Sequence, residues 1–234
     1  GAFWVVGVVF RRLGIPERIR VRDVVKLIQV GRDLFVRTGL LTVFFIFSTR
    51  AATRIGADAG AAHQAIRQVW VFTALFLDAY AITGQSLIGF FMGPGRLEQA
   101  RRVARVVCAW SAATGVILSA AMWLGQHLVV RLLLPPSAGD IFFSAWLMAV
   151  VFQPINALAF ASDGIHWGTG DFRFLRNVMI AATTFGGIAI YLLDETVSGA
   201  LMWIWLITGC WITIRAGFGV LRIWPGLGRS PLKK

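Results

Sequence analysis

The sequence contains little charge and few cysteines. Charged residues make up 15% of its 234 residues and hydrophobic residues 57%, whereas a soluble domain averages roughly 25% and 45–50%. The two cysteines, Cys108 and Cys210, lie in apolar runs at a spacing that fits neither a disulfide framework nor a metal site. These shortages exclude a soluble enzyme, a disordered tail and a secreted disulfide scaffold. The mean hydropathy of +0.72 indicates an integral membrane protein.

Common enzyme motifs are also missing from the sequence. It has no Walker-type phosphate loop, no HExxH zinc motif and no GxSxG nucleophile motif. Its three histidines, His63, His127 and His166, share no metal-ligand spacing. We therefore predict no enzymatic activity, no cofactor and no bound metal.

Acidic residues are scarce, with 11 Asp and Glu against 23 Lys and Arg. A nucleic-acid-binding domain gathers such an excess on one face, but here the basic residues lie between apolar runs. Most fall in alternate connections, including residues 11–32 and a C-terminal group to which we assign Arg215 and Arg222. The positive-inside rule then predicts a multi-pass plasma-membrane protein with a cytoplasmic C-terminus. Its partner is the lipid bilayer and not nucleic acid.

Long apolar runs predict an all-α membrane protein, because they are continuous and lack the two-residue alternation of barrel strands. The run at 1–10 is too short for a bilayer, which takes about 20 residues. We expect it to be the tail of a helix that begins before residue 1. Residues 11–23 then form a basic linker, 24–222 a six-helix bundle and 223–234 a basic tail. The predicted spans are 24–48, 69–92, 103–130, 141–162, 178–193 and 199–221.

Polar side chains interrupt several predicted spans. Asp78 and Gln85 lie two helical turns apart on one face, and Gln153, Asn156 and Asp163 share a face of another span. A charge in a hydrocarbon span costs roughly 2.5–3.5 kcal/mol on insertion scales. We therefore predict that these residues line a water-filled pathway in which a carboxylate binds a proton or a cation.

Arg37, in the first span, leaves two alternatives open. It could pair with Asp78 or Asp163, in which case the acids only lock helix packing. It could instead contact an anionic substrate. The candidate pathway residues are Asp78, Gln85, Gln153, Asn156, Asp163 and Arg37.

Three stretches resemble the multidrug and toxic compound extrusion (MATE) family, and more narrowly its DinF-like subfamily. They are RIGADAGAAHQ at 54–64, FLDAYAITGQSLIG at 76–89 and QPINALAFASDGIHWGTGD at 153–171. The resemblance implies a twelve-helix fold in two six-helix lobes, of which this chain is the second and the N-terminal lobe is its missing partner. It implies an antiporter that exports drug-like cations or organic acids in exchange for H+ or Na+ by alternating access. The resemblance then implies a coupling ion, H+ or Na+, and no other cofactor.

The sequence departs from the family at one position. One branch of the family has an ion-binding carboxylate where this sequence has Asn156, so the resemblance implies that this ion site is absent. In the DinF-like branch the coupling carboxylate lies in the first lobe, which leaves the coupling ion open. Two other functions stay open. One is a lipid-linked oligosaccharide flippase of the same superfamily, which needs a larger and more cationic cavity. The other is a non-transporting membrane assembly lobe, in which Asp78 and Asp163 only pack.

Overall fold

A computed structural model describes residues 21–233, which form helices and turns without any strand. The predicted helix tail at 1–10 and most of the predicted linker at 11–23 lie outside the described residues. The predicted all-α fold is confirmed. The helices are α2 (Val21–Ile55), α3 (Ala57–Met92), α4 (Leu97–Leu124), α5 (Gln126–Leu133), the 3-10 helix η1 (Pro136–Ala138), α6 (Gly139–Val151), α7 (Gln153–Thr169), α8 (Phe172–Tyr191) and α9 (Ala200–Ile223).

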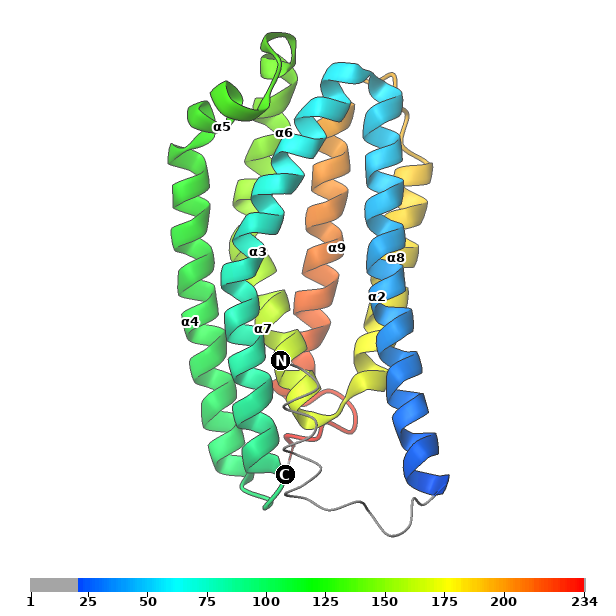
Figure 1. The fold of residues 1–234 in the computed structure, drawn as a ribbon, viewed down its shortest axis with the longest axis vertical. Helices are drawn as coiled ribbons and strands as arrows, with labels where there is room; N and C mark the ends of the chain where they lie inside the picture. Colours follow the sequence, from blue (N-terminus) through cyan, green and yellow to red (C-terminus); the bar gives the residue numbers. More distant parts are fainter. Residues whose placement is uncertain (1–20, 234) are drawn as a thin grey trace, which may run out of the picture.

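The long helices stand side by side in an elongated bundle (Figure 1). α9 packs against α2, α6, α7 and α8, and α3 packs against α2, α4, α6 and α7. α7 packs against α3, α4 and α9, while α8 lies along α2. The short α5 leads from α4 toward α6 at the end of the bundle that also holds the α2–α3 turn.

Four of the described helices, α3, α4, α8 and α9, are long and apolar enough to cross a membrane. α6 and α7 pass the same test together, so the number rises to five if this bent pair forms one span. The first predicted span, 24–48, lies within α2, which is not in this set and which carries charged residues such as Asp33 and Arg37. Each of the six predicted spans falls mainly on helical residues, but 103–130 and 141–162 contain breaks and 178–193 runs past the end of α8.

One predicted span and one predicted connection are wrong. The span 103–130 is not one helix, because α4 ends at Leu124 and α5 begins at Gln126. The connection expected between the first two spans is helical on both sides of Gly56, whose φ of 153° favours a residue without a side chain. His63, expected in that connection, is buried within α3. α2 and α3 therefore form a tight helical hairpin.

The predicted span 141–162 is broken at Phe152, where α6 and α7 meet at an angle of 45°. Pro154 explains the break, because proline has no N–H to donate to the carbonyl four residues earlier. That carbonyl, of Val150, instead accepts a hydrogen bond of 2.8 Å from the Ser119 hydroxyl of α4. A neighbouring helix thus supports the bend.

Glycines bring α7 close to α3. A side chain at Gly164 would meet the backbone of Ala81, and one at Gly168 would lie 2.7 Å from the Gln85 carbonyl oxygen. Small residues permit this close approach of membrane helices. The contact holds the second half of α7 against the part of α3 that follows Asp78.

The largest core cluster includes residues of α2, α6 and α9, and aromatic rings join α2 to α9 within it. Phe44 of α2 stacks on Trp211 of α9 with ring centroids 4.5 Å apart, and both side chains are fully buried. On α6, the buried Trp146 donates a hydrogen bond of 3.2 Å to the Met122 carbonyl of α4. Many large apolar side chains on the outside of the bundle stay exposed, as suits surfaces that face lipid or another membrane segment.

Candidate ion and substrate pathway

A buried polar cluster lies at the break between α6 and α7. The side-chain nitrogen of Gln153 donates a hydrogen bond of 2.7 Å to the Thr73 hydroxyl of α3. The side-chain nitrogen of Asn156 lies 3.5 Å from the side-chain oxygen of Gln153. Both amides are completely buried, and the Asn156 side-chain oxygen has no hydrogen-bond partner among the described residues. The structure thus brings these two predicted residues together and leaves one acceptor free.

Asp163, further along α7, belongs to a buried ion cluster that we call the Asp163 triad. Its Oδ2 atom accepts hydrogen bonds from Arg37 of α2 and from Arg215 of α9, the second at 2.7 Å. The side chains of Arg37, Asp163 and Arg215 are 13%, 10% and 4% exposed. Arg37 also lies over the Trp167 ring at 5.2 Å and Arg215 over the Trp211 ring at 4.6 Å. One carboxylate therefore joins three helices.

Two further carboxylates each pair with an arginine from another helix. Asp33 of α2, whose side chain is 3% exposed, accepts a hydrogen bond of 2.7 Å from Arg176 of α8. Asp171, between α7 and α8, accepts one of 2.8 Å from Arg222 of α9. A buried charge without a partner is costly, so these pairs compensate the acids and link α2, α8 and α9 beside the triad.

Asp78 differs from these acids. It is half-buried in α3 and forms no ion pair or hydrogen bond with any residue of the described range 21–233. Gln85, two turns further, is exposed and also has no side-chain hydrogen bond to the described part of the chain. Arg37 pairs with Asp163 and not with Asp78. Within residues 21–233, no group of three or more His, Cys, Asp or Glu side chains could hold a metal ion.

Sequence reasoning misplaced Arg215. It assigned this residue to the basic C-terminal end, whereas α9 continues to Ile223 and buries the arginine. The predicted span 199–221 already contained Arg215, so the rule that charges inside spans need partners could have identified it. Thr73 was missed because a single threonine in an apolar run gives no comparable signal.

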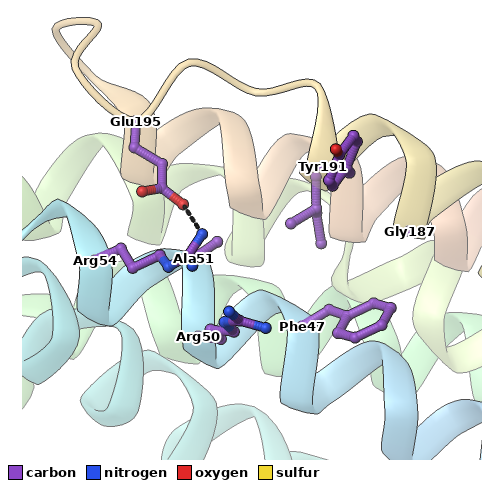
Figure 2. Close-up of a pocket in the computed structure, with 8 residues that line it drawn as sticks. Phe47, Arg50, Ala51, Arg54, Gly187, Tyr191 and Glu195 are labelled. Atoms are coloured by element: carbon purple, nitrogen blue, oxygen red, sulfur yellow. Dashed lines mark ion pairs between the residues drawn. The ribbon is translucent and has the colours of Figure 1, made fainter.

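Two grooves flank α2 in the half of the bundle that holds the α2–α3 turn. The groove between α2 and α8 has a volume of about 330 Å³ and is drawn in Figure 2, where Arg54 pairs with Glu195 at 3.7 Å and Arg50 lies apart from that pair. The groove between α2 and α3 has a volume of about 580 Å³ and is lined by Arg50 and Arg67. Arg50 thus borders both grooves.

Asp194 lies in the connection between α8 and α9, outside the apolar helices. Its Oδ1 atom accepts a hydrogen bond of 2.7 Å from the Thr196 hydroxyl and one of 2.9 Å from the Thr196 backbone N–H. These two hydrogen bonds favour the charged form and lower the pKa of the Asp194 carboxyl.

Known proteins resemble this chain along most of its length. The MatE family model matches residues 34–192, which is more than half of the chain. The chain is 31% identical over 205 residues to Protein DETOXIFICATION 44, chloroplastic, of Arabidopsis thaliana, a match that covers 80% of this chain and 39% of that protein. It is 32% identical over 225 residues to the Probable multidrug resistance protein NorM of Pseudomonas aeruginosa, covering 93% of this chain and 41% of the relative.

A third relative is DNA damage-inducible protein F of Escherichia coli, which is 24% identical over 200 residues, covering 85% of this chain and 43% of that protein. The chain thus spans about two fifths of the length of these relatives. The family match extends from within α2 to the end of α8. It includes Asp78, the break between α6 and α7, and two members of the Asp163 triad, Arg37 and Asp163. Together with its apolar helices, this match shows that the chain is a multi-pass membrane protein of the MatE family.

Proposed function

We propose that this chain is the C-terminal six-helix lobe of a DinF-like secondary antiporter that exports organic compounds in exchange for H+ or Na+. The family match and relatives named for multidrug resistance and detoxification support export. The chain spans about two fifths of those relatives, which supports a second lobe as its partner across a central substrate cavity. Two lobes that rock about such a cavity provide alternating access.

We assign Asp78 of this lobe to exchange of the coupling ion, in addition to the first-lobe carboxylate that the family resemblance implies. The observation that supports this assignment is that Asp78 forms no ion pair with a described residue. A carboxylate inside an apolar span is costly unless it has a partner or reaches water. Asp78 has no partner among residues 21–233. Binding of a proton or Na+ would neutralise the Asp78 carboxylate during transport and remove that cost. Release of the ion would restore the charge.

The Asp163 triad has a different role in this proposal. Both arginines of the triad bind the same carboxylate oxygen. Protonation of Asp163 would leave two buried guanidinium groups without their common anion, which is far more costly than protonation of an unpaired acid. We therefore assign Asp163 and Arg37 to holding α2, α7 and α9 together rather than to ion exchange.

The break between α6 and α7 supports a substrate-facing role for Gln153 and Asn156. Interrupted membrane helices place polar groups beside binding sites in many transporters. The Asn156 side-chain oxygen has no partner among the described residues and is buried in this conformation. It could accept a hydrogen bond from a substrate N–H or O–H group once a movement of α6 against α7 exposes it. Gln85, exposed on α3, is a second polar contact on the same pathway.

The proposed location is the plasma membrane, with the C-terminus in the cytoplasm. Support comes from the basic residues near the α3–α4 and α7–α8 connections and in the C-terminal segment. The burial of Arg215 removes one residue from that basic set but leaves the others in place.

The test uses the complete protein in proteoliposomes, with rhodamine 123 as a cationic probe and carboxyfluorescein as an anionic probe. Dye movement is measured under an imposed H+ gradient and, separately, an imposed Na+ gradient. We expect at least one gradient to drive dye movement and Asp78→Asn to reduce this coupled movement at least about tenfold, since the variant cannot carry the coupling charge. Asp140→Asn, at the exposed start of α6, is the matched control and should transport normally.

Either of two results contradicts the proposal. Wild-type coupling in Asp78→Asn would remove Asp78 from the ion pathway. If the wild-type protein moves neither dye under either gradient, the non-transporting assembly lobe is the better description.

A further inference from the structure

The groove between α2 and α3 carries positive charge without a compensating acid. Arg50 and Arg67 line it, and its described lining contains no Asp or Glu. Arg50 has no ion pair or hydrogen bond with any of residues 21–233, and Arg67 lies over the Phe45 ring at 5.4 Å. By contrast, Arg54, one turn beyond Arg50, pairs with Glu195. The groove therefore presents two guanidinium groups that form no ion pair with a described carboxylate, since Glu195, which lines the α2–α8 groove together with Arg50, pairs with Arg54.

A hydroxyl group lies beside these arginines. The Thr49 hydroxyl is 3.3 Å from Nε2 of the buried His63. When Nε2 carries the ring proton, it donates to Thr49, and the threonine hydroxyl keeps its own proton for a ligand. Thr49 also lines the groove, so one neutral donor accompanies the two charged ones.

The remaining lining comes from α2 and is partly apolar, and the hydroxyls of its other two members, Thr42 and Thr53, donate to backbone carbonyls of α2. Leu41, Phe45 and Ile46 line the groove together with the polar groups. The volume of about 580 Å³ lies within the range of roughly 300–1,000 Å³ typical of small-molecule sites. A ligand that fits this lining has an anionic group for the arginines and an apolar body for the aliphatic and aromatic wall.

We propose that the groove between α2 and α3 is a further binding site for the transported compound, separate from the polar residues at the break between α6 and α7, and that this compound is an organic anion, such as a carboxylate or sulfonate on an apolar body. This inference rests on the proposed transport function and names the substrate class within it. Arginine suits the role because its planar donors bind a carboxylate at two points and stay charged in an apolar setting.

The test measures equilibrium binding of two dyes to the complete protein in lipid nanodiscs by fluorescence polarisation. Carboxyfluorescein and rhodamine 123 share a xanthene core but carry opposite charge, so their comparison isolates the charge preference. We expect wild-type protein to bind carboxyfluorescein more tightly than rhodamine 123. Arg50→Gln and Arg67→Gln should each weaken carboxyfluorescein binding about tenfold, the effect of losing one charge-assisted contact.

Arg54→Gln is the matched control, because Arg54 lies one turn away on α2 and already pairs with Glu195. It should leave carboxyfluorescein binding unchanged. Arg67→Lys keeps the charge without the planar fork and should fall between wild type and Arg67→Gln. A thermal unfolding midpoint equal to that of wild type shows that each variant is folded.

Three results overturn the inference: equal or tighter wild-type binding of rhodamine 123, unchanged carboxyfluorescein binding in both glutamine variants, or an equal loss in Arg54→Gln. These failures are distinct from failure of the proposed function. A protein that moves rhodamine 123 under an ion gradient but does not bind carboxyfluorescein is an antiporter without this anion site. If the protein binds carboxyfluorescein through Arg50 and Arg67 but moves no dye, the binding site is supported and the proposed transport function is contradicted.

Discussion

The arginines of the Asp163 triad and those of the α2–α3 groove differ in their partners. At the Asp163 triad, each arginine is buried against a carboxylate and an aromatic ring. In the α2–α3 groove, Arg50 and Arg67 have no carboxylate partner among the described residues. Compensated charge joins helices, whereas uncompensated charge is available to a ligand. The same contrast separates Asp163 from Asp78, although both are acids within apolar helices.

The largest expected effect follows from removing the shared anion of the triad. Asp163→Asn leaves Arg37 and Arg215 buried without a countercharge, which should destabilise the protein by about 3–5 kcal/mol. Thermal unfolding of the purified complete protein, followed by size-exclusion chromatography, measures this loss. Asp78→Asn is the control and should unfold within a few degrees of wild type, because no described partner loses its ion pair. Equal effects of the two substitutions would remove the contrast between the acids.

A second substitution sharpens the comparison through packing rather than charge. Gly164→Ala should destabilise the protein by about 1–3 kcal/mol, as overpacked side chains do, because the new methyl group meets the backbone of Ala81. Gly217→Ala on α9 is the matched control, since no atom lies within 4 Å of the added carbon. A lower unfolding temperature for Gly217→Ala than for Gly164→Ala would show that the close contact of α3 and α7 has little effect on stability.

The smallest expected effect concerns an acid at the surface. The hydrogen bonds from Thr196 lower the pKa of Asp194 below its ordinary value of 3.8. A lowered pKa in the folded protein adds stability above the unfolded pKa, and this contribution is lost as the pH falls through the folded pKa. The difference in unfolding temperature between wild type and Asp194→Asn should therefore be present at pH 5 and vanish well below pH 3.8. A difference that does not change with pH would contradict this assignment.

Apolar composition was sufficient to predict the class of fold. Each predicted span lies mainly on helical residues because a long hydrophobic run has few other ways to satisfy its backbone in a membrane. The helix boundaries were less predictable. The break at Phe152 depends on Pro154 together with a hydroxyl from α4, and the hairpin at Gly56 depends on one glycine between two helix-forming segments. Neither changes local hydropathy enough to mark a helix end.

The candidate site was predictable as a set of residues but not as a set of contacts. Intramembrane polarity identified Asp78, Gln153 and Asp163, because each is costly in hydrocarbon. Which acid pairs with Arg37 depends on the rotation of α2 about its axis, and the sequence does not specify that rotation. The second arginine of the triad was hidden among basic residues near the C-terminus. The roles of these residues in a transport pathway stay predictions.

The length of the α2–α3 hairpin has a geometric consequence. α2 has 35 residues and α3 has 36, so at about 1.5 Å per residue each is about 50 Å long. The hydrocarbon core of a bilayer is about 30 Å thick, so even a tilt of about 40° leaves part of each helix outside that core. The ends of the hairpin therefore reach at least into the headgroup region, and any rotation of its buried part must also displace those ends there.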